Sequence, residues 1–277
     1  MIGINKITKG RMGNRLFHYH FLRQVSKKTG LDYFHPNLPD SKYFEDMEKK
    51  KRPFSLFKKE TVLTSKEVLN FKPEELVEFV KKENNIGKDV VFNPPMLGEV
   101  FFDYLFYPPE EFIKIKDKFK VDFNFGTENK TVVGLHFRGT DFKAWNENAS
   151  LKFEYYKAAI DFCLQELKEN NLVFVIFTDD LKFDTFTKTV DCLKSLNVEY
   201  YISDNRRSAI YDLYQMSQCD ILVSSPSTFA IFAGILGKNK KIIHAKSWLD
   251  YAVAQNDTFW VKLLKSESQY YSIWKSF

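Results

Sequence analysis

Two hydrophobic patterns alternate along this chain, and their order predicts an α/β fold. Short apolar runs of strand length lie at residues 2–7, 32–34, 89–92, 132–135, 172–177, 198–202, 221–223 and 241–244. Between most of them, apolar residues recur every three or four positions, which is typical of a helix that buries one face. This second pattern predicts helices at residues 16–30, 152–169, 186–196, 208–219 and 230–236, and others that begin at Pro73 and Pro108. Strands that alternate with helices form parallel sheets with right-handed crossovers.

A polar stretch interrupts this alternation and predicts a boundary between two domains. Residues 116–130 are polar and contain Gly126, so we expect a first domain at residues 1–126 and a second at residues 127–277. A chain of 277 residues is long enough for two domains of ordinary size. The final aromatic stretch, residues 259–277, is expected to form a helix that packs back on the first domain. Residues 42–72 are charged and mixed, and they give no clear element.

Composition narrows the classes of function. The net charge of +5 is mild and dispersed, which fits an anionic small ligand and does not indicate nucleic-acid binding. Cys163, Cys192 and Cys219 lack metal-ligand spacing and cannot all pair, which indicates free thiols in a reducing compartment. The sequence has neither a signal peptide nor a run of about 18 apolar residues. We therefore expect a cytoplasmic protein without a transmembrane segment, and leave peripheral association with a membrane open.

The first candidate for chemistry is a glycine loop between a predicted strand and a predicted helix. Gly10, Arg11, Met12, Gly13 and Asn14 form this loop. Its two glycines allow a tight turn and a close approach to a ligand, and the helix that follows offers free N–H groups to an anion. The loop matches neither G-x-G-x-x-G nor the P-loop pattern. An ordinary turn between strand and helix is the structural alternative.

The second candidate follows the apolar run at residues 132–135. His136, Arg138, Thr140 and Asp141 come at the end of this predicted strand, where open α/β sheets bind their ligands. An arginine suits a phosphate there, because its planar fork donates two parallel hydrogen bonds. An ion pair between Arg138 and Asp141 is the alternative interpretation.

Two further strand ends carry polar residues at the same rim of the predicted sheet. One carries Thr178, Asp179 and Asp180, and the other reads Ser224-Ser225-Pro226-Ser227-Thr228-Phe229. Hydroxyl groups at a helix N-terminus can hold an anion, although serine is also a common helix cap. The convergence of three polar strand ends favours a binding site. The chain has no Asp-x-Asp triplet, so we expect no metal and no cofactor.

Several of these segments resemble fucosyltransferases. Gly10 to Phe17 is similar to the Gly-x-x-Gly-Asn-Gln-Leu-Phe opening of the α-1,2-fucosyltransferases, and His136 to Asp141 is similar to the His-x-Arg-Arg-Gly-Asp or His-x-Arg-Arg-Thr-Asp motif of the wider α-1,2, α-1,6 and protein O-fucosyltransferase superfamily. Leu97 to Phe102 resembles a Gly-Tyr-Phe-Gln segment of the α-1,2 group, and Cys219 to Ala230 resembles the third motif of the family. The order matches over residues 10 to about 236.

The resemblance implies a GT-B fold, in which two Rossmann-like domains face each other across a cleft. It also implies inverting, metal-independent transfer of L-fucose from GDP-β-L-fucose to a hydroxyl of an acceptor glycan, in an α-1,2 linkage to a galactoside. The partners would then be a GDP-sugar and an oligosaccharide or other glycan. The rival interpretations are a transferase of the same fold with another GDP-sugar or another linkage, and a non-catalytic protein that binds nucleotides or glycans.

The same resemblance assigns roles to residues. Arg138 would hold the β-phosphate as GDP departs, and His136 would orient the site. The other residues expected to be catalytic are Asn14 and Asp141. Residues expected to bind substrate are Gly10, Arg11, Met12, Gly13, Thr140, Asp179, Asp180, Ser224, Ser225, Ser227, Thr228 and Phe229. Among these, Ser225, Ser227 and Thr228 would contact the diphosphate, and Asp179 or Asp180 would help to bind the guanosine.

Four carboxylates are candidates for the general base, and two positions depart from the family pattern. Candidates for the base are Asp141, Glu147, Glu99 and Asp103. Arg15 stands where the family usually has glutamine, and Gly139 stands where a second arginine is common. The second departure removes a positive charge from the expected diphosphate site. Arg11 or the pair Arg206 and Arg207 could compensate for it.

Overall fold

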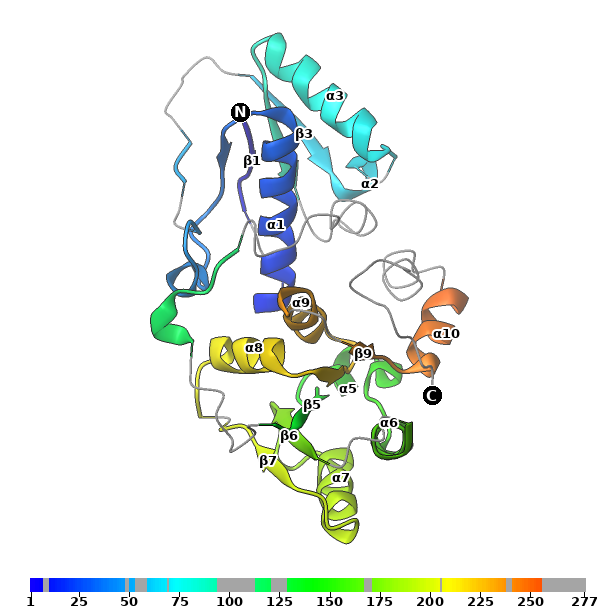
Figure 1. The fold of residues 1–277 in the computed structure, drawn as a ribbon. Helices are drawn as coiled ribbons and strands as arrows, with labels where there is room; N and C mark the ends of the chain where they lie inside the picture. The colour runs from blue at the N-terminus through cyan, green and yellow to red at the C-terminus, as the bar shows by residue number, and fades with distance from the viewer. Residues whose placement is uncertain are drawn as a thin grey trace. The chain divides into compact units, whose positions relative to one another are not determined.

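The chain divides into two compact units of the α/β class (Figure 1). The structure is a computed structural model that describes residues 1–6, 10–47, 50–52, 59–68, 70–93, 113–120, 129–166, 171–204, 206–237 and 241–255. The units are Met1–Asp117 and Lys118–Phe277. The domain boundary predicted after residue 126 falls in a stretch outside the described residues, as do the predicted helices at Pro108 and at residues 259–277.

The first unit contains a four-stranded parallel sheet with the order β2-β1-β4-β3. Its strands are β1 (Ile2–Ile4), β2 (Tyr33–Phe34), β3 (Glu60–Thr64) and β4 (Asp89–Asn93). Its helices are α1 (Met12–Thr29), α2 (Ser65–Val68) and α3 (Pro73–Asn85), with a 3-10 turn η1 (Ser41–Tyr43). A further 3-10 turn, η3 (Asp117–Phe119), lies where the chain passes from the first unit to the second. The sequence predicted β1, β2, β4, α1 and α3. It gave no signal for β3, because Leu63 alone is buried in that edge strand and no apolar run results.

Helix α1 is buried along most of its length, which settles the role of its two histidines. It ends at Gly30, which adopts the left-handed conformation (φ 72°) that a glycine at this position permits. Burial lowers the pKa of His18 to about 4 and the pKa of His20 to about 3. Both imidazoles are therefore neutral packing residues at pH 7.

The second unit contains a five-stranded parallel sheet with the order β7-β6-β5-β8-β9. Its strands are β5 (Thr131–Phe137), β6 (Leu172–Thr178), β7 (Tyr200–Ile202), β8 (Ile221–Val223) and β9 (Lys241–Ile243). Its helices are α5 (Phe142–Trp145), α6 (Phe153–Glu166), α7 (Asp184–Ser195), α8 (Ala209–Gln218), α9 (Thr228–Leu236) and α10 (Lys246–Ala254), with a 3-10 turn η4 (Glu147–Ala149). Helices α6 and α7 lie on one side of this sheet, and α8 and α9 lie on the other (Figure 1). The sequence predicted all of these strands and the helices α6 to α9, but neither α5 nor α10.

The strand order of this second sheet identifies a place for a ligand. Strand β5 is central, the chain first moves outward to β6 and β7, and it then returns to add β8 and β9 on the other side. The chain therefore reverses direction between β5 and β8. In open α/β sheets, the connections beyond such a switch point separate and leave a crevice at the carboxyl ends of the two strands. Every strand end that the sequence singled out in this unit lies at that rim.

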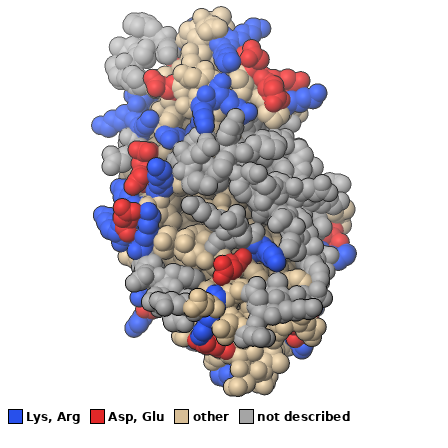
Figure 2. All heavy atoms as spheres, viewed as in Figure 1, with Lys and Arg blue, Asp and Glu red and all other residues tan. Residues whose placement is uncertain are grey.

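The charged side chains on the surface are dispersed. On the face shown in Figure 2, basic and acidic side chains of the described residues are interspersed.

Within the part of the chain that the structure describes, no helix combines the length and the apolarity that crossing a bilayer requires. None of the three cysteines is in a disulfide; Cys163 and Cys219 are buried, and Cys192 is half-buried.

Candidate active site

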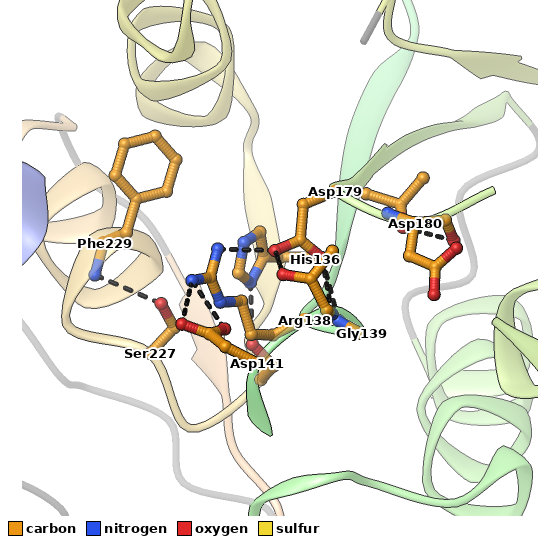
Figure 3. A network of polar contacts seen from close by, with 11 residues as sticks. His136, Arg138, Gly139, Asp141, Asp179, Asp180, Ser227 and Phe229 are labelled. Carbon is orange, nitrogen blue, oxygen red and sulfur yellow. Dashed lines mark hydrogen bonds and ion pairs between the residues drawn. The ribbon is translucent and has the colours of Figure 1, made fainter. Parts of the chain in front are cut away.

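Arg138 directly follows strand β5, at the switch point of the second sheet. Its Nη2 lies 2.8 Å from Oδ1 of Asp141, and its Nη1 lies 2.6 Å from Oδ2 of Asp179 (Figure 3). The guanidinium also stands over the ring of Phe142, 5.4 Å from the ring centroid. The ion pair that the sequence left open as an alternative is therefore present, and a second carboxylate from the end of β6 joins it. Two carboxylates face one guanidinium, so these three side chains carry a net negative charge.

Asp179 joins the loop after β5 to the end of β6. Its Oδ1 accepts the N–H of Gly139 at 2.8 Å, and its Oδ2 accepts the hydroxyl of Thr140 at 2.7 Å. Burial alone would raise the pKa of Asp179, but the Gly139 hydrogen bond, the Arg138 charge and the Thr140 hydrogen bond outweigh burial and lower this pKa. Asp179 is therefore ionised at neutral pH and holds both the loop and the guanidinium.

His136 connects the two strands that flank the switch point. Its Nδ1 and the Oγ of Ser225, which follows β8, are 2.8 Å apart. Burial, aided by the nearby positive charge of Arg138, lowers the pKa of His136 to about 3. The imidazole is therefore neutral at pH 7. This geometry suits an orienting group that fixes the serine turn beside Arg138.

The serine-rich turn after β8 is largely engaged with the protein itself. Ser227 Oγ accepts the N–H of Phe229 at 3.3 Å, so the predicted alternative of a helix cap applies to Ser227. Ser224 Oγ donates to the carbonyl of Ser225 at 2.7 Å. These three serines are buried, whereas Thr228 and Phe229 are half-buried at the first turn of α9. Thr228, Phe229 and the helix N-terminus are therefore the parts of this turn that an incoming ligand can reach most easily.

The glycine loop belongs to the first unit. Gly10 adopts a φ of +91°, and a Cβ built there would lie 2.6 Å from Cβ of Asn14. Only glycine fits this turn. Arg11 is exposed before the first residue of α1, Met12 and Gly13 are buried in the first turn, and Asn14 is half-buried. The structure therefore brings Gly10 and Asn14 together at the start of α1.

Other predicted site residues are less central or lie outside the described residues. Asp180 Oδ1 accepts the N–H of Lys182 at 2.9 Å and so closes the turn after β6. Glu147 is exposed in η4, whereas Glu99 and Asp103 lie outside the described residues. Arg206 and Arg207 both pair with Asp204 after the edge strand β7, two strands away from β5. Among the residues that the structure describes, no group of three His, Cys, Asp or Glu side chains is placed to hold a metal ion.

Sequence reasoning missed two tyrosines that support the strand ends. The hydroxyl of Tyr156 on α6 donates to the carbonyl of His136 at 2.9 Å, and its ring stacks on Phe137 with the centroids 4.0 Å apart. The hydroxyl of Tyr155 lies 3.0 Å from the carbonyl of Ser224 and 2.8 Å from that of Ile243. Helix α6 thus ties together the ends of β5, β8 and β9. In the sequence, both tyrosines have only the apolar spacing of a core helix.

Tyr156→Phe is expected to lower the free energy of unfolding by about 1 kcal/mol, because the buried carbonyl of His136 loses a donor. Urea denaturation of the wild type and the variant measures this difference. Tyr201→Phe is the matched control, since the Tyr201 hydroxyl contacts Glu199 at the exposed surface. It should change stability by less than about 0.5 kcal/mol. Equal effects of the two substitutions would contradict the supporting role of Tyr156.

Asp212 is a third residue that sequence reasoning missed. It lies on α8, and its Oδ1 accepts the hydroxyl of Ser203, just after β7, at 2.6 Å. Burial raises the pKa of Asp212 to about 6, although the Ser203 hydrogen bond and the charge of Arg207 oppose the shift. Because burial disfavours the charged form, the ionised carboxylate of Asp212 lowers the stability of the fold at neutral pH. An isolated aspartate in an amphipathic helix gives no signal of this in the sequence.

Asp212→Asn is expected to raise the free energy of unfolding by about 1–2 kcal/mol near pH 8 and to change it little near pH 4. Because the pKa is raised in the folded state, the folded chain binds the extra proton between about pH 4 and pH 6. The favourable contribution of this proton is complete below pH 4 and is lost as the pH rises through 6. Urea denaturation at the two pH values measures the difference. A stabilisation of equal size at both values would show that the Asp212 charge is not its source.

A known protein family and several solved structures are similar to this chain. A sequence model of the family described as "Glycosyl transferase family 11" matches residues 101–274. The solved structure of POFUT1 in complex with GDP-fucose is 11% identical, with a TM-score of 0.55, and the match covers 86% of this chain and 96% of that one. Arabidopsis thaliana FUT1, solved as a mutant with GDP, is 12% identical, with a TM-score of 0.53, and the match covers 88% of this chain and 69% of that one. No curated protein matches the sequence.

These matches confirm the predicted fold class and family. Two parallel α/β sheets and similarity to POFUT1 and FUT1 place the chain in the GT-B fold class. At identities of 11–12%, the structural likeness establishes the fold alone. The family match covers more than half of the chain, and it confirms that the protein is an enzyme of the predicted fucosyltransferase kind. The chain belongs to glycosyl transferase family 11.

Proposed function

We propose that the enzyme transfers L-fucose from GDP-β-L-fucose to a hydroxyl of an acceptor glycan, with inversion at C1 of fucose and without a metal ion. The position of Arg138 carries this proposal, because it places a fixed cation at the switch point of a nucleotide-binding type of sheet. The solved structures of POFUT1 with GDP-fucose and of FUT1 with GDP support the choice of donor. The resemblance to α-1,2-fucosyltransferases supports a galactoside as the acceptor and an α-1,2 linkage.

Arg138 acts on the leaving group in this scheme. The acceptor oxygen forms a bond to C1 of fucose while the bond from C1 to the β-phosphate oxygen breaks, and that oxygen keeps the electron pair. Negative charge therefore grows on the β-phosphate. A guanidinium that is already held in place stabilises this charge most in the transition state, because no reorganisation is needed when it appears.

Phosphate binding requires Arg138 to exchange a partner. Asp141 is the more exposed of its two carboxylates, with 48% of the side chain accessible against 25% for Asp179. Asp179 has further hydrogen bonds from Gly139 and Thr140 that hold it in place. The donor phosphate therefore displaces Asp141, and Asp179 keeps the guanidinium in position. Once displaced, Asp141 is available beside the reacting centre.

The general base remains one of four carboxylates. Asp141 becomes available by the exchange described above, and Glu147 lies a short way along the chain, on the exposed turn η4. Glu99 and Asp103 remain predictions from the sequence. Because the fucose ring becomes positively charged in the transition state, the acceptor hydroxyl needs only modest help in losing its proton.

Turnover of GDP-sugars by the purified chain tests the proposal. GDP release is measured with GDP-fucose and with GDP-mannose, each with a panel of β-galactosides, in the presence of EDTA or of Mn²⁺, and NMR gives the linkage of any product. We expect GDP release with GDP-fucose but not with GDP-mannose, at a rate that EDTA does not change, and a product with a new α-1,2 bond. Release with GDP-mannose or a different bond would favour the alternative of another donor or linkage. Binding of GDP without turnover of any donor would favour a non-catalytic protein.

A further inference from the structure

Arg15, which departs from the family pattern, joins two segments of the first unit. Its Nη1 donates to the carbonyl of Gly10 at 2.7 Å. Its Nη2 donates to Oδ1 of Asp40 at 3.1 Å, and its Nε donates to the other carboxylate oxygen. Asp40 is buried, with 4% of the residue exposed. The guanidinium thus uses all three of its nitrogens within the protein, and we call this arrangement the Arg15–Asp40 clamp.

One end of the clamp is the turn that precedes α1. Gly10 has a left-handed φ of +91° and packs against Asn14. The hydrogen bond from Arg15 fixes the carbonyl of Gly10. It therefore also fixes the peptide plane through which the chain enters the helix. A turn with a left-handed residue has several competing conformations, so a fixed carbonyl selects one of them.

The other end of the clamp is anchored by backbone pairing. Tyr43 donates its N–H to the carbonyl of Asp40 at 3.0 Å, and Lys116 donates its N–H to the carbonyl of Tyr43 at 3.0 Å. Phe44 forms an antiparallel bridge with Ile115 beside them. Asp40 therefore lies on a segment that is fastened to residues 114–116, where the chain is about to leave the first unit.

We propose that Arg15 is a positioning residue, which acts through Asp40 to fix the turn from Gly10 to Asn14 for the donor, and that it does not itself bind the diphosphate. This inference rests on the proposed function, together with the expectation from the sequence that Gly10 to Asn14 contact the GDP-sugar. Both faces of the Arg15 fork are already engaged by a buried carboxylate and a backbone carbonyl. Release of Arg15 toward a phosphate would leave the carboxylate of Asp40 buried without its partner, which is strongly unfavourable.

Four variants separate positioning from direct binding. Arg15→Gln restores the residue that is usual in the family, and Arg15→Lys keeps the charge without the fork. Asp40→Asn removes the anchoring charge, and the fourth variant combines Arg15→Gln with Asp40→Asn. Arg23→Gln is the matched control, because Arg23 lies on the same helix and bonds the hydroxyl of Tyr33. Turnover of GDP-fucose and the calorimetric Kd for GDP are measured for each.

The expected result is that Arg15→Gln and Asp40→Asn each lower kcat by about 10- to 100-fold and leave the Kd for GDP nearly unchanged. The double variant should be no worse than either single one, because both remove the same interaction. Arg15→Lys should not rescue kcat, since a single ammonium cannot span Asp40 and Gly10. Arg23→Gln should keep wild-type kcat. Normal kcat in Asp40→Asn together with weaker GDP binding in Arg15→Gln would overturn the proposal, because Arg15 would then bind the phosphate directly.

Amide hydrogen exchange tests the clamp without any turnover. In both Arg15→Gln and Asp40→Asn, amides of residues 11–16 should exchange at least about tenfold faster, while those of β5 and β6 keep their rates. Unchanged exchange at residues 11–16 would overturn the clamp even if the enzyme is active. A wild-type chain that neither binds GDP nor turns over GDP-fucose would contradict the proposed function instead, and the exchange result would still decide whether Arg15 positions the turn.

Discussion

Arg138→Ala is expected to lower kcat for fucosyl transfer by about 10³-fold while the fold is retained. The side chain is a preorganised cation at the switch point of the sheet, and loss of one such donor from an enzyme site typically costs about 10²–10³-fold in kcat. We expect the upper end of this range. Gly139 stands where the family commonly has a second arginine, so Arg138 bears more of the task alone. Steady-state kinetics with GDP-fucose and thermal unfolding measure both parts of the expectation.

Two further variants sharpen this experiment. Arg138→Lys keeps a positive charge but cannot bridge Asp141 and Asp179 as the fork does, so it should recover only part of the activity. Arg206→Ala is the matched control, because this exposed arginine pairs with Asp204 at the far edge of the sheet. It should leave kcat unchanged. If Arg138→Ala keeps more than a tenth of the wild-type kcat, the leaving-group role is wrong.

The sequence predicted the parts of the site that depend on strand ends. Apolar runs place β5, β6 and β8 reliably, and in a parallel sheet the residues after each run meet at one rim. His136, Arg138, Asp179 and Ser225 are indeed brought together, although positions 136 and 225 are far apart in the chain. The apolar runs were sufficient here because a strand buried in a parallel sheet is almost continuously apolar.

The sequence could not predict contacts that depend on side-chain packing between distant elements. Tyr156 looks like any core residue of α6, and its hydroxyl bond to His136 emerges only when the helix is docked on the sheet. Asp40 lies in a short segment with two prolines and no apolar periodicity, residues 35–41, so nothing marked it as the partner of Arg15. Arg15 itself was noticed only as a departure from a pattern. Hydrogen-bond partners across the fold have no local signature, which is why these residues were missed.

The absence of an arginine at position 139 concerns the packing around Gly139 as well as the charge of the site. A Cβ at this buried position would lie 2.9 Å from Cβ of Asp180 and 3.2 Å from Cβ and Cγ of Phe183. Phe183 is itself buried, and its N–H donates to the carbonyl of Asp180 at 3.2 Å, so the facing turn cannot easily move away. The loop after β5 has therefore closed around a glycine.

Gly139→Arg is consequently expected to be harmful, although it restores the charge that is common in the family. Overpacking against Asp180 and Phe183 should lower the free energy of unfolding by about 2–3 kcal/mol. Displacement of the Gly139 N–H from Asp179 should also disturb Arg138 and lower kcat by about 10²-fold. Urea denaturation and steady-state kinetics measure the two effects.

Gly139→Ala separates the steric part of this effect from the charge. It introduces the Cβ clash alone, so it should lie between the wild type and Gly139→Arg in both stability and kcat. An arginine variant with unchanged stability and tighter GDP binding would show that the site has room for a second cation. Gly139 would then differ from the arginine that is common in the family only by the loss of a positive charge. The expected order of wild type, Ala and Arg would instead show that the turn after β6 was built around Gly139, so that a single guanidinium, held by Asp179, serves the phosphate.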